Sequence, residues 1–318
     1  MLLSRVADAL YWISRYLERA EHAIRLIDVR LDLGLDRRPD GWEFGGLYTS
    51  LGLLPENHRA RYPGALIDAV VFDPSNRGSV AACVTAAREN AQQVREEISA
   101  DMWQQINELY LLITAESRNL APADLPGFCQ QVRMGCHLIH GILHVTMSHN
   151  HAWQFIRLGS QLERADKTTR ILDVKYFILL PSLSDVGTPY DDVQWSAVLK
   201  SVSGFEMYRK RHGRISPEKI AEFLLLDAEF PRALRYCIAI ADRSLHLITG
   251  TPVGTYSCPS EQRMGMLRGE LDFANVEQIL STGLHEFCDA AQTKMNTIDE
   301  CISGDFFAQR PLTSIARA

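Results

Sequence analysis

The most constraining feature of the sequence is an uninterrupted amphipathic segment between Ala7 and Leu31. It contains neither glycine nor proline, and its apolar residues recur every three or four positions. These apolar residues are Leu10, Ile13, Leu17, Ala20, Ile24, Ile27 and Leu31. Such a period places them along one side of an α-helix. We therefore predict a long helix here, whose apolar side must be covered by other elements.

A second segment, residues 150–177, has the same period and repeats part of the first. Residues 16–21 read Tyr-Leu-Glu-Arg-Ala-Glu, and residues 161–166 read Gln-Leu-Glu-Arg-Ala-Asp. The match continues without a gap, at a constant offset of 145 positions, as far as Val29 and Val174. A repeat this distant is not the period of a solenoid, which is about 20–50 residues. It indicates two helical halves, related by duplication, that pack as a pseudo-symmetric pair.

The rest of the chain also has helical rather than strand-like patterns. No stretch alternates between apolar and polar residues for long enough to require a sheet. We predict further helices at about 42–53, 62–72, 78–97, 99–113, 127–147, 195–211, 216–226, 231–248 and 275–304. The expected fold class is all-α, a multi-helix bundle with two pseudo-symmetric halves. We expect one domain over residues 1–304, with halves 1–148 and 149–304, and a tail over 305–318.

Composition limits the classes of function. The chain has 318 residues, of which 46% are apolar, so it can bury a large core without metals or disulfides. Acidic residues outnumber basic ones by 39 to 33, which argues against a general nucleic-acid-binding surface. No apolar run approaches the ~20 residues of a membrane span, and the first residues have no apolar signal core. The seven cysteines include no C-x-x-C pair, which favours reduced thiols in a cytoplasmic protein.

Charged residues follow one line on each repeated helix, beside its apolar side. With ~100° between successive residues, the charged residues of these lines are Glu18, Glu21, Arg25 and Asp28 in the first helix and Glu163, Asp166, Arg170 and Asp173 in the second. The i, i+4 and i, i+3 spacings within each line allow an acid–base–acid ladder. Arg19 and Arg164 point away from the lines by about a further quarter turn. Each motif glutamate is therefore not expected to bond to the arginine that follows it.

Two interpretations of these lines are open. They can be exposed ladders of ion pairs, which contribute only ~0.3–0.5 kcal/mol per pair. Alternatively, they can face each other and form a partly buried polar cleft, where charges need partners and often have functional roles. The repetition of the same residue types in both halves favours the cleft.

In such a cleft, Glu18 and Glu163 are the candidate acid and base groups. Arginine side chains can hold a carboxylate or phosphate through paired hydrogen bonds. Replacing Glu163 with glutamine is expected to impair function and to leave the fold intact. The candidate residues for binding a substrate or partner are Arg19, Glu21, Arg25, Arg88, Arg95, Arg164, Asp166, Arg170, Arg232 and Arg235.

The sequence motifs do not favour a bound metal or a nucleotide cofactor. His140 and His144 have the i, i+4 spacing of zinc ligands, but no H-E-x-x-H motif accompanies them. Core or capping roles are therefore favoured for these histidines, and we predict no metal and no cofactor. The sequence also contains no G-x-x-x-x-G-K-[ST], G-x-G-x-x-G or G-x-S-x-G motif, so ATP hydrolysis by this chain alone is not expected.

Four blocks of the chain, in order, resemble the Alpha-E family of all-helical bacterial proteins named for a Glu-Arg motif. The first block is residues 1–21, and the third is residues 155–166. The second comprises residues 87–95 with Met102, Trp103 and Asn107, and the fourth is residues 222–237. One departure from the family pattern is Ala233, where a serine is expected.

The resemblance implies partners rather than a reaction. Alpha-E proteins are typically encoded beside, or fused to, a circularly permuted ATP-grasp ligase, often together with a transglutaminase-like protease. We therefore expect a helper subunit of such a ligase, in a pathway that makes or modifies a peptide-like or amide-linked metabolite. An enzyme that uses Glu18 and Glu163, and a helical scaffold that forms homo-oligomers, are the alternatives.

Overall fold

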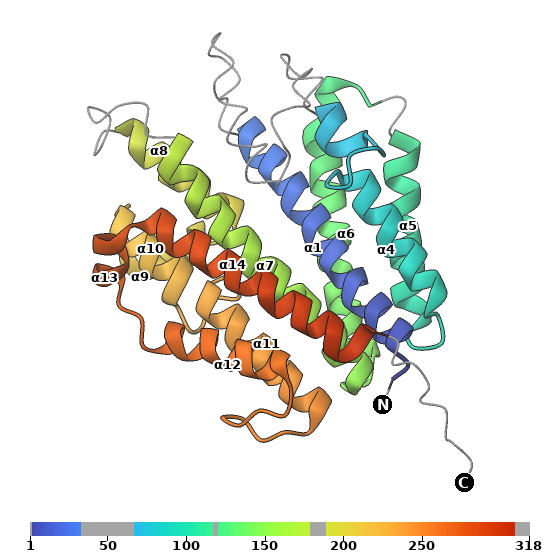
Figure 1. Cartoon of the computed structure of the whole chain (residues 1–318). Helices are drawn as coiled ribbons and strands as arrows, with labels where there is room; N and C mark the ends of the chain where they lie inside the picture. Colours follow the sequence, from blue (N-terminus) through green and yellow to red (C-terminus); the bar gives the residue numbers. More distant parts are fainter. Residues whose placement is uncertain (1, 33–66, 117–119, 179–188, 309–318) are drawn as a thin grey trace.

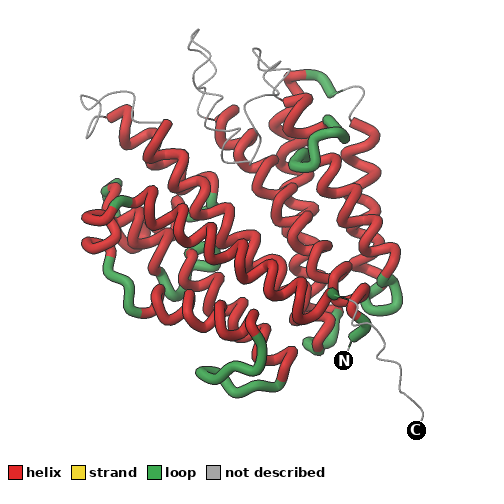
Figure 2. Tube along the Cα trace, viewed as in Figure 1, coloured by secondary structure: helices red, strands yellow, loops and turns green. Residues whose placement is uncertain are grey.

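The computed structural model describes residues 2–32, 67–116, 120–178 and 189–308. Within these ranges every regular element is helical and no strand is present (Figure 2). The all-α fold class predicted from the sequence is thereby confirmed. None of the described helices is long and apolar enough to cross a membrane.

The first half of the chain forms a group of four long helices (Figure 1). In this group α1 packs against α4 and α6, and α5 packs against the same two helices from the far side. The buried apolar residues of α1 meet a core that includes Val84, Ile106 and Val132. The four helices are α1 (Ser4–Asp32), α4 (Val80–Gln93), α5 (Ala100–Glu116) and α6 (Leu125–Thr146), with short turns η3 (Asp68–Phe72) and η4 (Pro122–Asp124) before α4 and α6.

The second half contains a group with the same order of neighbours. Here α7 packs against α11 and α14, and α12 packs against the same two helices. The four helices are α7 (His151–Ile178), α11 (Leu234–Thr249), α12 (Pro259–Asp272) and α14 (Leu284–Ile302). Shorter elements complete this half: α8 (Pro189–Ser201), α9 (Phe205–His212), α10 (Pro217–Leu226), α13 (Val276–Thr282) and the π-helical turn η6 (Ser303–Phe307).

The two repeated helices, α1 and α7, lie side by side and run in the same direction. Gly159 lies against the backbone of Tyr11, and one to two turns later Arg164 bonds to Glu18. A Cβ atom on Gly159 would lie 2.3 Å from the carbonyl oxygen of Tyr11 and 2.6 Å from Ser14 Oγ. Only glycine therefore allows this approach, which brings the two charged lines together.

Two predicted helices are wrong because each is broken in the structure, and one helix of the structure was not predicted. The helix predicted at 195–211 is broken between α8 and α9, where Ser203 has a left-handed φ of 54°. The helix predicted at 275–304 is broken at Gly283, whose φ of 121° ends α13. No helix was predicted at α12, whose glycines argue against one. The helix predicted at 42–53 lies outside the described residues, and only the last part of the one at 62–72 is described.

The end of the described chain belongs to the core. The ring of Phe307 lies 5.3 Å from that of Tyr11, and the ring of Phe306 lies 5.6 Å from that of Phe155. The π-helical turn after α14 therefore closes the base of the α1–α7 pair.

The close approach at Gly159 generates a testable expectation. Gly159→Ala should destabilise the protein by about 1–3 kcal/mol, because the added methyl group forces α1 and α7 apart. Gly141→Ala is the matched control, since a Cβ there meets nothing within 4 Å. The control should be neutral or stabilising by up to about 1 kcal/mol, the usual gain of alanine over glycine in a helix. Urea unfolding of the three proteins measures both effects, and equal stability of the two variants would contradict the close approach.

Candidate functional site

The two Glu-Arg motifs exchange partners across the α1–α7 interface. Arg19 holds both oxygens of Glu163, with Nε at 2.8 Å from Oε1 and Nη2 at 3.1 Å from Oε2. Reciprocally, Arg164 Nε lies 2.6 Å from Glu18 Oε1. Each motif glutamate is thus bound by the arginine of the other motif. The helical wheel correctly separated each glutamate from its neighbouring arginine, but it did not predict this exchange.

Glu163 is the centre of one cluster of charges. Arg15 Nε lies 2.8 Å from Glu163 Oε2, and Lys167 Nζ lies 3.4 Å from Oε1. Arg15 also reaches Asp299 of α14 at 2.6 Å. The side chain of Glu163 is fully buried, so three cations, including Arg19, surround one anion that has no access to water. Sequence reasoning missed Arg15, although it lies one turn before Arg19 on the same helix.

The neighbouring acid of this cluster, Asp166, is held by its own helix. Lys167 Nζ lies 3.0 Å from Asp166 Oδ2, and Arg170 Nε lies 2.8 Å from the same oxygen. The i, i+4 ladder predicted for Asp166 and Arg170 is present, and it continues the cluster along α7.

Glu18 and Glu21 form a second cluster, which gathers residues from four helices or their starts. Arg232, just before α11, places Nη1 3.7 Å from Glu18 Oε2 and Nη2 3.0 Å from Glu21 Oε2. His140 Nε2 of α6 lies 2.9 Å from Glu18 Oε1, and Arg25 pairs with Glu21 one turn along α1. Both carboxylates are at most 1% exposed, so the charged lines are buried rather than exposed ladders.

Arg232 is fixed in this cluster by its backbone as well as its side chain. Thr168 Oγ1 of α7 donates a hydrogen bond of 2.8 Å to the carbonyl oxygen of Arg232. The next residue, Ala233, is the N-cap of α11 and has no side chain to cap the helix. At the N-cap of α4, Ser79 Oγ accepts from the amide of Ala82. The start of α11 beside the charged cluster therefore has no side-chain cap.

The ionisation of the glutamates follows from their partners. Burial alone would raise the pKa of Glu18, but Arg164, His140 and Arg232 outweigh it and hold the pKa well below its usual range. Burial likewise opposes ionisation of Glu163, and Lys167, Arg15 and Arg19 reverse the effect, so its pKa is also well below the ordinary value. Both carboxylates are therefore anions at neutral pH, which suits ion pairing better than proton transfer.

Positive charge is in excess beside Glu21. Three guanidinium groups, those of Arg25, Arg164 and Arg232, face the two carboxylates of Glu18 and Glu21. Burial, followed by repulsion from Arg232 and Arg133, lowers the pKa of Arg25 to about 9. Burial, followed by Arg25 and Arg232, lowers the pKa of His137 to about 4. An additional anion would relieve this repulsion.

The same cluster contains buried polar atoms without partners. Within the described part of the chain, Glu18 Oε2, His22 Nε2 and Arg25 Nε make no hydrogen bond. Such atoms cost free energy unless a water or a ligand satisfies them. The side chain of His137, which is 42% exposed and 3.4 Å from Glu21, connects the cluster to the surface.

The remaining predicted residues lie elsewhere. Arg88 Nε bonds to Asn107 at 2.7 Å, and its guanidinium lies 4.6 Å from the ring centroid of Tyr110. Arg95 lies over Trp103 at 4.8 Å. These two arginines line the α4–α5 contact and do not join the glutamates. Arg235 bonds to Asp272 of α12 at 3.0 Å, away from Arg232 and its partners.

The histidines of α6 contact acids or aromatic rings. His137 and His140 face Glu21 and Glu18, whereas the ring of His144 lies 5.1 Å from that of His149. His149 in turn stacks on Trp153. In the segments that the structure describes, no three histidine, cysteine or acidic side chains form a group able to hold a metal ion.

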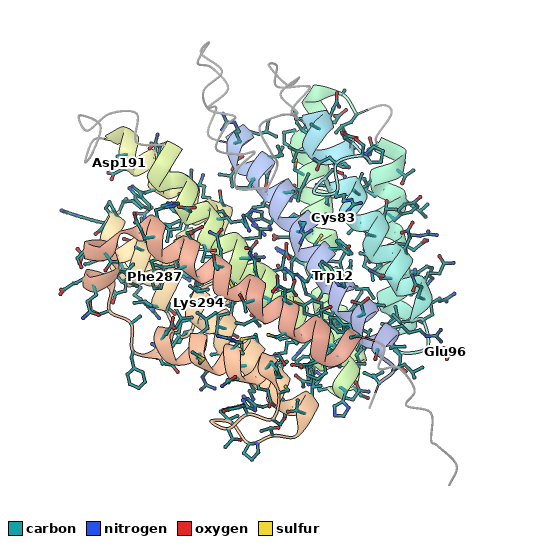
Figure 3. All side chains as sticks on the ribbon, viewed as in Figure 1. Trp12, Cys83, Glu96, Asp191, Phe287 and Lys294 are labelled. Carbon is teal, nitrogen blue, oxygen red and sulfur yellow. The ribbon has the colours of Figure 1, made fainter. Side chains whose placement is uncertain are left out.

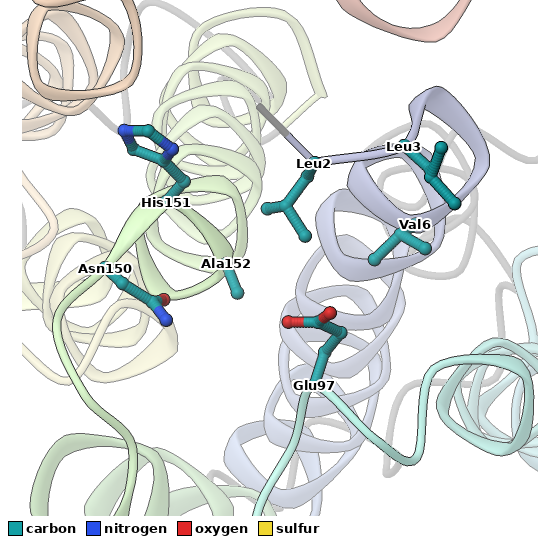
Figure 4. Close-up of a pocket in the computed structure, with 7 residues that line it drawn as sticks. All are labelled: Leu2, Leu3, Val6, Glu97, Asn150, His151 and Ala152. Carbon is teal, nitrogen blue, oxygen red and sulfur yellow. The ribbon is translucent and has the colours of Figure 1, made fainter.

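A hollow of about 390 Å³ opens near the first residues of α1 and α7 (Figure 4). Figure 4 shows Leu2, and Glu97 from the segment before α5, facing it together with Asn150 and His151. It contains none of the residues predicted from the sequence, and its charged side chain, Glu97, is exposed. We therefore assign the candidate site to the charged clusters instead.

The comparisons with known proteins agree with the motif. A family model, Alpha-E, described as a predicted alpha-helical domain with a conserved ER motif, matches residues 2–307. The uncharacterized proteins Rv2567 of Mycobacterium tuberculosis and Mb2597 of Mycobacterium bovis are each 26% identical over 257 residues, covering 73% of this chain. The chain spans only 28% of the length of these relatives. No solved structure matches.

Full burial changes the expected effect of removing the Glu163 charge. Glu163→Gln leaves Arg15, Arg19 and Lys167 without their shared anion, so we expect a loss of about 3–5 kcal/mol in unfolding free energy. The structure thus adds a strong destabilisation to the impaired function that the sequence predicts for this variant. Glu229→Gln is the control, because Glu229 is 83% exposed and pairs with Arg211 at the surface. It should cost less than about 1 kcal/mol, and comparable losses in both variants would refute the burial argument.

The pH dependence of stability should depend on His22. Burial, followed by Lys167 and Arg232, lowers its pKa from 6.5 to about 3. Between these values the unfolded chain binds a proton that the folded chain does not, so stability falls as pH decreases from 6.5. One such group contributes a slope of up to about 1.4 kcal/mol per pH unit.

In His22→Gln this slope should be smaller between about pH 6 and pH 5, as measured by chemical denaturation at several pH values. His151→Gln, which changes an exposed histidine at the start of α7, is the control and should keep the wild-type slope. An unchanged slope in His22→Gln would show that His22 is not buried in its neutral form.

Proposed function

This chain belongs to the Alpha-E family, and from that premise we propose that it is a helper subunit of a circularly permuted ATP-grasp ligase. The ligase would make or modify a peptide-like or amide-linked metabolite, using ATP that this chain does not itself hydrolyse. The helper would bind an anionic group of the substrate, or of the ligase, through the guanidinium groups of Arg25 and Arg232 beside Glu21. We call these two groups the cationic edge.

The excess of cations beside the buried glutamates carries this proposal. Arg164 and Arg19 are occupied in the reciprocal pairs with Glu18 and Glu163. Arg25 and Arg232 share Glu21 as a partner and repel each other, and their pKa values are lowered by burial and by neighbouring cations. A carboxylate or phosphate that reached them past His137 would gain charge-assisted hydrogen bonds.

The alternative in which Glu18 and Glu163 transfer protons receives less support. A general acid or base at neutral pH needs a pKa near neutrality. Both carboxyl groups have lowered pKa values, and each is surrounded by cations that would resist its protonation. A binding role therefore fits the charged clusters better than acid–base catalysis.

The length of the relatives supports a role beside other domains. The region similar to this chain occupies 28% of the mycobacterial proteins. The family is thus found within much longer chains, as a module that works with a ligase domain would be. The transglutaminase-like protease expected from the family resemblance is a second proposed partner, and homo-oligomers are a further possibility.

We also infer that the two halves arose by duplication. In each half, four long helices contact one another in the same cyclic order. This order is α1, α4, α5 and α6 in the first half and α7, α11, α12 and α14 in the second. Asp28 of α1 pairs with Arg133 of α6 at 2.5 Å, and Asp173, at the equivalent position of α7, pairs with His285 of α14 at 2.6 Å. The reciprocal Glu-Arg pairs then lie where the two halves meet.

We place the protein in the cytoplasm, where ATP is available to the ligase. All seven cysteines lie in described segments, and none forms a disulfide. Burial raises the pKa of Cys83, Cys136 and Cys237 to about 12, so these thiols are unreactive core side chains.

Reconstitution tests the helper proposal. The reaction mixture contains the purified chain, the ATP-grasp ligase encoded beside it, ATP, and candidate amines and acids. We expect product only when every component is present. Arg232→Gln should reduce the rate by about tenfold or more, equivalent to about 1.4 kcal/mol. Arg235→Gln is the matched control, since Arg235 pairs with Asp272 and not with the glutamates.

Thermal unfolding of each variant separates loss of fold from loss of function. Full ligase activity without this chain would overturn the helper role. Equal activity of the Arg232 and Arg235 variants, with both folded, would instead exclude the cationic edge as the functional surface.

A further inference from the structure

A second hollow, of about 460 Å³, lies between α11, α12 and the loop that joins them. In Figure 1 these two helices lie at the lower edge of the molecule, where α12 packs against α11 and α14. None of the residues in its floor is predicted from the sequence to be functional. Its volume is in the range of small-molecule sites.

The floor of this hollow contains a carboxylate that is only half satisfied. Asp242 is 2% exposed, and its Oδ2 accepts from Arg268 Nη1 at 2.6 Å. Its other oxygen, Oδ1, is buried and has no hydrogen-bond partner in the part of the chain that the structure describes. Leaving a buried acceptor unsatisfied costs about 1–3 kcal/mol, more for a charged group. The oxygen is therefore placed for a donor that comes from outside the fold.

His246 lies beside this oxygen and is oriented by the backbone. Its Nδ1 is 3.0 Å from the carbonyl oxygen of Thr251, which can only accept, so Nδ1 carries the proton. In the neutral ring Nε2 is then an acceptor, and it lies 3.5 Å from an oxygen of Asp242, Oδ1. Nδ1 also lies 3.5 Å from Glu261 Oε1. In the neutral form of the ring two acceptors, Nε2 and Asp242 Oδ1, face each other, and a group with several N–H donors would satisfy both.

The charge of the lining favours a cation. Three carboxylates, those of Asp242, Glu261 and Asp272, line the hollow, against one guanidinium, that of Arg268. Glu261 is already satisfied, because the backbone amide and hydroxyl of Ser257 and the hydroxyl of Thr249 donate to it. Asp272 pairs with Arg235 and Arg268. The acceptor left without a donor is therefore Asp242 Oδ1, at the floor.

The wall and rim of the hollow suit an apolar stem. Tyr256 and Met266 are 62% and 55% exposed, and both line the opening. Gly265 and Gly269 lie one turn apart on α12, and a Cβ atom on either would meet nothing within 4 Å. Alanine would stabilise the helix by about 1 kcal/mol at each position. No steric constraint requires these glycines, and their effect is to keep the hollow open.

We propose that this hollow binds an alkylammonium group, with its N–H donors between Asp242 and His246 and its apolar stem against Tyr256 and Met266. The group can belong to a free amine or to a lysine side chain of a peptide, since both have the same terminal chemistry. This site is separate from the cationic edge beside Glu21 and does not depend on the helper proposal.

Binding to the full-length chain tests the proposal. Isothermal titration with n-butylammonium, with the neutral isostere n-butanol, and with Nα-acetyl-lysine methylamide distinguishes charge from apolar burial and free amine from lysine. We expect saturable binding of both cations and at least about tenfold weaker binding of the alcohol. The tighter of the two cations identifies the source of the ammonium group.

Two variants locate the binding site. Asp242→Asn removes the charge and should weaken cation binding by about tenfold or more. Gly269→Leu fills the hollow from α12 without removing any charge and should abolish binding. Glu270→Gln is the matched control on the same helix, because Glu270 pairs with Lys294 and neither residue lines the hollow. Figure 3 labels Lys294 on α14.

The proposal is overturned if no probe binds saturably, or if the alcohol binds as tightly as the ammonium. Unchanged binding in a folded Gly269→Leu variant would also overturn it, whatever the behaviour of Asp242→Asn. Each of these results leaves the ligase reconstitution unaffected, so the two proposals fail separately.

Discussion

The reciprocal pairing of two glutamates and two arginines across α1 and α7 is the interaction on which the rest of the fold depends. Removing Glu163 from water is costly, and the cost is offset only because Arg15, Arg19 and Lys167 reach it from two helices. Neither helix alone supplies that set of cations. Ionised glutamates in the core therefore require α1 and α7 to be adjacent, parallel and in one register.

That register places the other helices around the clusters. The approach at Gly159 brings the backbones of α1 and α7 together, and α6 and α11 then cover the pair from two sides. His140 comes from α6 and Arg232 from the start of α11, so both four-helix groups contribute side chains to Glu18. The candidate site is consequently a product of the junction between the two halves, and it cannot form within either half alone.

The sequence predicted the parts of this arrangement that are local. The helices α1 and α7, the all-α class and the i, i+4 pair of Asp166 and Arg170 follow from periodicity and spacing. The exchange between motifs, and the contact of Arg232 with Glu21, join residues far apart in the chain, and spacing does not report such distances. Helix α12 was missed because Gly265 and Gly269 interrupt its pattern, and the break at Gly283 depends on a backbone angle that glycine permits but does not require.

Helix α11 lies between two sites of opposite charge preference. Arg232, before its first turn, faces the glutamates of α1, whereas Asp242 faces α12. The ten positions between them correspond to about 15 Å along a helix at ~1.5 Å per residue. One small molecule cannot span that distance and also pass to the other side of α11. An anion at one site and an ammonium at the other would therefore belong to two ligands, or to well-separated groups of one peptide.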